Sequence, residues 1–158
     1  MATTGRIHNF GAGPAVLPLE VVEECRKSLP NLNNSGFGLI EISHRSQTFQ
    51  NIVDSSMEKL RRILSIPEDY TVLYLQGGAS LQFYMSALNL LRENEKVDFL
   101  VTGAWSQKAM KEANRIGDAS ARWDDNGNGF RSIPKNGEYS IRKDSLYLHY
   151  TSNNTLFG

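Results

Sequence analysis

The residues best suited to chemistry lie at positions 76–80, where Gln76 is followed by Gly77, Gly78, Ala79 and Ser80. An apolar, strand-like run precedes the two glycines, and apolar residues at helical spacing follow Ser80. Glycines let the backbone approach a ligand closely, and the free N–H groups at the start of a helix attract anions. This stretch therefore predicts a phosphate-binding turn.

The turn differs from the two best-known phosphate motifs. It has neither the Lys-Ser/Thr ending of a P-loop nor the third glycine of a dinucleotide fingerprint, which argues against nucleoside triphosphates and NAD. A simpler alternative stays open, in which Ser80 serves only as the N-cap of the following helix.

A second candidate is the pair His44-Arg45, which precedes a predicted helix. An arginine at such a junction can grip a carboxylate or phosphate with two parallel hydrogen bonds. The alternative is a surface Arg45 that pairs with Glu41, beside a solvated His44.

The third and fourth candidates each follow a predicted strand. Trp105 comes just after residues 97–102 and could offer a flat face to a planar ring, or could simply pack. Hydroxyl and amide side chains at positions 151–155, ending in Thr155, could bond a polar ligand or only satisfy the loop backbone.

Helices and strands are predicted to alternate along much of the chain. Helical spacing predicts helices after Pro18, around residues 49–64, after Ser80 and over residues 105–116. Strands are predicted over residues 71–75, 97–102, 119–123 and 146–150, the last as a buried strand. The alternation favours an α/β fold with a mostly parallel sheet covered on both faces.

Three of the four candidates would then lie past the carboxyl ends of strands, where open parallel sheets bind their ligands. A phosphate-binding turn, a flat aromatic ring and hydroxyl groups in one crevice suit a planar heterocycle that carries a phosphate.

Composition narrows the class of protein. The chain has 158 residues, equal numbers of acidic and basic residues, and so a formal net charge of zero. No overall electrostatic field draws it to nucleic acid or to an anionic membrane.

Cys25 is the only cysteine, which rules out an intrachain disulfide, and it is expected to be buried. No signal-peptide pattern, membrane-length stretch or metal-binding cluster is evident, so a cytoplasmic protein is expected.

Taken together, these stretches resemble motifs of the phosphoserine aminotransferase family, within the class V pyridoxal-phosphate aminotransferases. The similar stretches occur in the family's order and spacing, at residues 10–18, 41–46, 76–83, 102–105 and 149–155. The resemblance implies the large domain of the aspartate-aminotransferase architecture (fold type I). It also implies pyridoxal 5'-phosphate as cofactor and a homodimer.

The resemblance assigns roles by matching motif. The backbone at Ala79 and Ser80 would hold the cofactor phosphate, Trp105 would stack on the pyridine ring, and the Thr155 hydroxyl would contact the cofactor. Arg45, with His44 beside it, would bind the acidic substrate. Many family members carry a basic residue in the phosphate turn, and that side-chain contact is missing here.

The implied reaction moves an amino group between O-phosphoserine and 2-oxoglutarate, giving 3-phosphohydroxypyruvate and glutamate, in serine biosynthesis. We expect residues 1–18 to form an N-terminal segment and residues 19–158 to form an incomplete large domain. The family's Schiff-base lysine and small domain lie beyond the motif at Thr155, so this chain alone is expected to be inactive.

Other interpretations remain open at this point. The domain could be complete, with residues 146–150 at a sheet edge. The parent could be another transaminase of the same fold, such as an alanine–glyoxylate aminotransferase. The chain could also be a non-catalytic fragment that binds phosphate or a partner chain.

Overall fold

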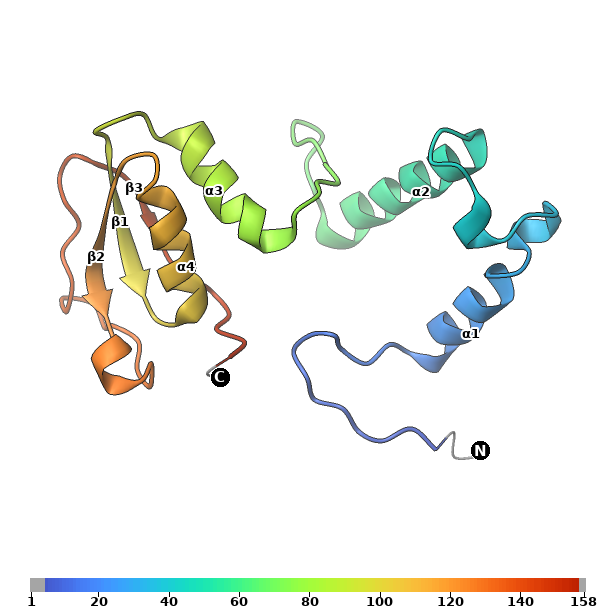
Figure 1. The fold of residues 1–158 in the computed structure, drawn as a ribbon, viewed down its shortest axis with the longest axis horizontal. Helices are drawn as coiled ribbons and strands as arrows, with labels where there is room; N and C mark the ends of the chain where they lie inside the picture. Colours follow the sequence, from blue (N-terminus) through green and yellow to red (C-terminus); the bar gives the residue numbers. More distant parts are fainter. Residues whose placement is uncertain (1–4, 157–158) are drawn as a thin grey trace. The chain divides into compact units, whose positions relative to one another are not determined.

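The structure, a computed structural model, describes residues 5–156 (Figure 1). The chain divides into two compact units, Met1–Leu73 and Tyr74–Gly158, and each is described by itself. The expected division between residues 1–18 and 19–158 stays a prediction, and residues 1–4 lie outside the described residues.

The first unit is helical. Helix α1 spans Leu19–Ser28 and α2 spans Gln47–Leu64, while short 3-10 helices η1 and η2 cover Leu32–Asn34 and Leu39–Glu41. Ser46 caps α2 by accepting a hydrogen bond from the Phe49 N–H, and Arg61 and Arg62 in the last turn suit the helix dipole. Both long helices lie where helical spacing predicts them.

Few side chains of the first unit are buried among the described residues. Helices α1 and α2 contain no buried residue, and large apolar side chains such as Phe10 and Ile40 are exposed. The expectation that Cys25 is buried is wrong, because its helix packs too little surface around it.

The predicted strand at residues 71–75 does not form. These residues are without regular secondary structure, although their composition is apolar and β-branched. A strand needs a hydrogen-bonded neighbour as well as a suitable sequence, and the described residues supply none for this run. The prediction from composition was therefore wrong.

The second unit is an α/β unit built on a three-stranded parallel sheet. Helix α3 spans Gly78–Leu90, strand β1 Lys96–Val101, helix α4 Ala104–Ala113 and strand β2 Asp118–Asp124. The 3-10 helix η3 (Asn126–Asn128) and strand β3 (Ser145–His149) complete it. The strand order is β2-β1-β3, so β1 lies in the middle (Figure 1).

The core of this unit gathers on one face of β1. Val97, Phe99 and Val101 share one face of the strand and are almost fully buried, and Asp98 and Leu100 on the other face are buried too, as in a central parallel strand. They pack with small and apolar side chains of the neighbouring elements, namely Ala87, Leu91, Ala109, Ala113 and Ala119. Burying a side chain such as Phe99 contributes roughly 1.5–3 kcal/mol. Strand β1 therefore packs with helices α3 and α4 into a core that supports the loops after β1 and β3.

The amino ends of the strands are held together by Arg142. Its Nε and its backbone N–H donate to the two carboxylate oxygens of the buried Asp98, at 2.7 and 2.6 Å. Its Nη1 donates to the Asp118 carboxylate at 2.7 Å, and Nη2 donates to the carbonyls of Val97 and Asp118. One side chain thus joins β1 to β2 just before β3 begins.

Strand β3 is less buried than its sequence suggested. Leu146 is 53% exposed, and the strand pairs on one side only, with β1. The apolar run predicts a strand with neighbours on both sides, and among the described residues it has one.

Candidate functional site

A cavity of about 400 Å³ lies where the start of α3, the start of α4 and the loop after β3 meet. Its walls are uncharged and mostly apolar, and they are formed by Gly78, Ala79, Ser80, Phe83, Trp105, Thr151, Asn153 and Thr155. One cavity is therefore lined by all four residues that were predicted to hold a phosphorylated ring, namely Ala79, Ser80, Trp105 and Thr155.

The start of α3 forms one wall. Gly77 and Gly78 have φ values of 91° and 58°, in the left-handed region that favours glycine, and a Cβ on Gly77 would overlap Leu81. The N-cap residue is Gly77, and no side chain caps this end. The idea that Ser80 is only an N-cap is thus wrong. The N–H groups of the first turn lack intrahelical acceptors and are suited to an anion.

Trp105 is held in the first turn of α4 by the buried residue next to it. The Ser106 hydroxyl accepts hydrogen bonds from the N–H groups of Thr102 and Gly103, at 2.9 and 3.0 Å, and donates to the Gly103 carbonyl. These bonds fix the turn that joins β1 to α4. The indole Nε1 then donates to Thr155 Oγ1 at 3.0 Å.

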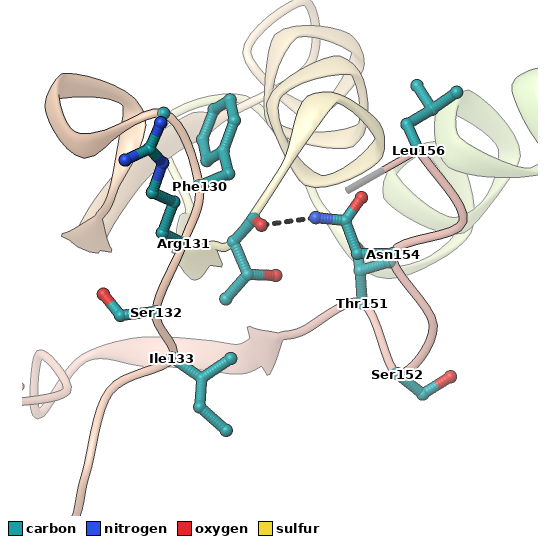
Figure 2. A pocket seen from close by; sticks show the side chains of 10 residues that line it. Phe130, Arg131, Ser132, Ile133, Thr151, Ser152, Asn154 and Leu156 are labelled. Carbon is teal, nitrogen blue, oxygen red and sulfur yellow. Dashed lines mark hydrogen bonds between the residues drawn. The ribbon is translucent and has the colours of Figure 1, made fainter. Parts of the chain in front are cut away.

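A second contact ties the loop after β3 to the loop after β1. Asn154 Nδ2 donates to the Thr102 carbonyl at 2.6 Å, drawn as a dashed line in Figure 2. Gly103 lies so close to this amide that a Cβ there would overlap it. Sequence reasoning missed the roles of Ser106, Asn154 and Gly103. The only available signal was that all three fall within or beside the recognised motifs.

Three buried polar side-chain atoms near the ends of β1 and β3 have no hydrogen-bond partner among the described residues. The Thr151 hydroxyl and Asn154 Oδ1 are buried without a hydrogen-bond partner, as is His149 Nε2. His149 stacks on Phe99 with ring centroids 4.7 Å apart, and burial lowers its pKa below the ordinary 6.5. Buried polar atoms without partners are uncommon. Of these three, Thr151 lines the cavity described above, whereas His149 and Asn154 are not among its lining residues.

A larger cavity of about 710 Å³ adjoins the first through Thr151 (Figure 2). Residues 129–133 and the loop after β3 line it, and Arg131 is its one charged side chain among the described residues. It has no helix start and no indole face in its wall. The smaller cavity therefore matches a phosphorylated ring better, although it is not the largest.

His44 and Arg45 belong to the first unit, between η2 and the start of α2. Both are exposed, and the Arg45 N–H donates to Ser43 Oγ at 3.2 Å. The Glu41 carboxylate accepts from the Gly38 N–H at 2.7 Å, and no ion pair of Arg45 is found within residues 5–156. The alternative in which Arg45 pairs with Glu41 is thus wrong for the described residues.

Comparison with known proteins identifies the family of the chain. The model of the aminotransferase class-V family matches residues 7–158, so the chain belongs to this family.

Its curated relatives include phosphoserine aminotransferases. The chain is 44% identical over 153 residues to that of Desulfotalea psychrophila, and 41% identical to that of Alkalihalobacillus alcalophilus. In both cases 97% of this chain is covered but 42% of the relative. The chain therefore spans less than half the length of the relatives it matches.

Solved structures give the same result. A phosphoserine aminotransferase studied for radiation damage of its Schiff base matches with a TM-score of 0.86 and 41% identity, over 97% of this chain and 43% of that one. The pyridoxal-phosphate-bound enzyme of Trichomonas vaginalis matches with a TM-score of 0.77 and 34% identity, over 90% of this chain and 40% of that one. The predicted α/β fold of a fold type I enzyme is thereby confirmed.

One further structural finding concerns membranes. Among residues 5–156, no helix has both the length and the apolar character needed to cross a bilayer.

Proposed function

We propose that this chain is the N-terminal part of the large domain of a phosphoserine aminotransferase, a homodimeric, cytoplasmic enzyme of serine biosynthesis. The whole enzyme would transfer an amino group between O-phosphoserine and 2-oxoglutarate. The observation that carries this proposal is that Ala79, Ser80, Trp105 and Thr155 line one uncharged cavity in a chain of the class-V aminotransferase family.

The residues present fit pyridoxal phosphate. The N–H groups of Ala79 and Ser80 at the start of α3 would bind its phosphate, as helix starts bind anions. The indole of Trp105 would lie against its ring, within walls that are mostly apolar. The orphaned Thr151 hydroxyl in the same wall supports a polar ligand there.

Thr155 would contact both the cofactor ring and Trp105. Its Oγ1 accepts the Trp105 indole N–H, so its own hydrogen stays available for donation. Thr155 would therefore donate to an acceptor on the ring, and the same contact would fix the plane of Trp105. When bound, pyridoxal phosphate supplies an electron-withdrawing system that stabilises negative charge on the substrate's α-carbon.

Arg45 would bind the anionic end of the substrate. Phosphoserine and 2-oxoglutarate both carry more than one negative charge, and a chain of zero net charge needs a local cation to hold them. Arg45 is exposed and without an ion-pair partner among residues 5–156, which leaves its guanidinium available, with His44 beside it.

The homodimer is supported by the first unit. It exposes large apolar side chains, including Ile7 at 84%, Phe10 at 93% and Ile40 at 81%. Surfaces of this kind are usually covered by another part of the polypeptide or by a second copy. Light scattering on the full-length protein would measure the mass in solution, and a monomer would contradict this part of the proposal.

The test is made in the full-length polypeptide that begins with this chain. We expect it to bind pyridoxal phosphate, seen as visible absorbance, and to aminate 2-oxoglutarate from O-phosphoserine. Arg45→Ala should raise KM for O-phosphoserine about tenfold or more, since a lost hydrogen bond to a charged group costs roughly 1.5–3 kcal/mol. The visible absorbance should be unchanged.

Arg62→Ala is the matched control, because Arg62 is also exposed and lies in the last turn of α2. It should leave KM unchanged. No cofactor absorbance in the parent would reject the proposed function. A parent that prefers alanine and glyoxylate would favour the related transaminase instead, because those less charged substrates give less reason for a cation at Arg45.

A further inference from the structure

Lys108 reaches the phosphate turn from a different element. It lies on α4, three residues after Trp105, so the two side chains share one face of the helix. Its Nζ donates to Ser80 Oγ at 2.7 Å and lies 5.9 Å from the centre of the Trp105 ring. Ser80 is the shared wall between the site cavity and a neighbouring one that Lys108 lines.

The charge of Lys108 is not neutralised within residues 5–156. No carboxylate lies within 4.0 Å of it, while Glu112, one turn further along α4, is paired with Arg115 at 2.9 Å. The ammonium instead points to a neutral hydroxyl and an indole face. A cation held in this way, beside a helix start, is placed to meet an anion.

The walls of the site cavity cannot themselves supply a positive charge to neutralise a bound anion. None of the residues that line it carries a charge. The start of α3 contributes the equivalent of about half a positive charge, which is less than a phosphate dianion requires. Lys108 is joined to the cavity by one hydrogen bond, through Ser80.

We infer that Lys108 is a positioning residue for the cofactor phosphate. This rests on the proposed function. The ammonium occupies a lone pair of Ser80 Oγ, so the Ser80 hydroxyl presents its own hydrogen to a phosphate oxygen. The positive charge behind the hydroxyl strengthens that bond and offsets the charge of the phosphate. Helix α4 thus provides the cation that the phosphate turn itself lacks.

The test compares two ligands that differ only in the phosphate. Binding of pyridoxal phosphate and of pyridoxal to the full-length apoprotein is followed by quenching of tryptophan fluorescence. Lys108→Met should raise Kd for pyridoxal phosphate about tenfold, since the residue acts through a charged hydrogen bond. It should change Kd for pyridoxal less than about twofold.

Two variants separate this role from a structural one. Lys108→Arg keeps the charge and should restore most of the affinity for pyridoxal phosphate. Lys111→Met, at an exposed position on the same helix, should leave both affinities unchanged. Equal weakening of both ligands by Lys108→Met would mean a structural role, and no weakening would also overturn the inference. If the unmodified protein binds neither ligand, the proposed function itself fails.

Discussion

The ion cluster around Arg142 allows a sharp test of how the strands are held. Arg142→Met keeps the apolar stem of the side chain and the backbone N–H that donates to Asp98 Oδ2. It removes the guanidinium from Asp98 Oδ1, from the Asp118 carboxylate and from the carbonyls of Val97 and Asp118. Asp98, which is 0% exposed, would lose its guanidinium partner.

The size of the effect follows from the burial of each contact. Burial disfavours the charge on Arg142, but its hydrogen bonds to Asp98 and Asp118 outweigh this and raise its pKa, so it stays charged. The pair with Asp118 is worth little, because that carboxylate is 51% exposed. The pair with Asp98 dominates, and breaking a buried pair from one side costs about 3–5 kcal/mol.

Native-state hydrogen exchange of the β1 amides in the full-length protein would measure this cost locally. A loss of about 4 kcal/mol should speed their exchange by a factor on the order of a thousand. Arg122→Met is the matched control, since Arg122 lies 4.0 Å from the same carboxylate and donates mainly to the Ser140 carbonyl. Comparable exchange rates in the two variants would refute the assignment of Arg142 as the main partner of Asp98.

Further predictions concern the loops and the buried histidine. Gly103→Ala should displace the Asn154 amide and weaken pyridoxal-phosphate binding, whereas Gly127→Ala, with open space around it, should not; fluorescence titration would compare them. Ser106→Ala should cost about 1–3 kcal/mol of unfolding free energy, because two N–H groups lose a buried acceptor. Burial lowers the pKa of His149 in the folded state, so below about pH 6.5 the unfolded state takes up a proton that the folded state does not. The free energy of unfolding should therefore be constant in this respect above about pH 6.5 and fall below it, by at most about 1.4 kcal/mol per pH unit. Urea unfolding at pH 7.5 and 5.5 should show this loss in the parent and not in His149→Phe.

Elements with a strong local pattern could be predicted from the sequence. The apolar spacing of α2, the apolar run of β1 and the glycines before α3 each depend on residues that are neighbours in the chain. The same holds for the two site residues that follow strands, because strand ends in a parallel sheet converge whatever their exact pairing. Trp105 and Thr155 could therefore be placed together before any distance was known.

Features that depend on distant residues could not be predicted. Whether residues 71–75 form a strand depends on a neighbour that their own sequence does not reveal. The bond from Lys108 to Ser80 links positions 28 apart, and that from Asn154 to Thr102 links positions 52 apart. A lysine on a helix gives no sign of which loop it will reach, since that is fixed by the packing of α3 on α4.

Charge and apolar surface are separated along the sheet of the second unit. The ion cluster of Arg142, Asp98 and Asp118 joins the strands near their amino ends, while the cavity at their carboxyl ends has uncharged walls. Uncharged, mostly apolar walls offer an anion few other partners, so each nearby dipole or cation contributes a larger share of its binding. One helix start and one lysine beside Ser80 can then attract an anion although the formal net charge of the chain is zero. The affinity for phosphate should therefore depend on the position of Lys108 far more than on the number of basic residues in the chain.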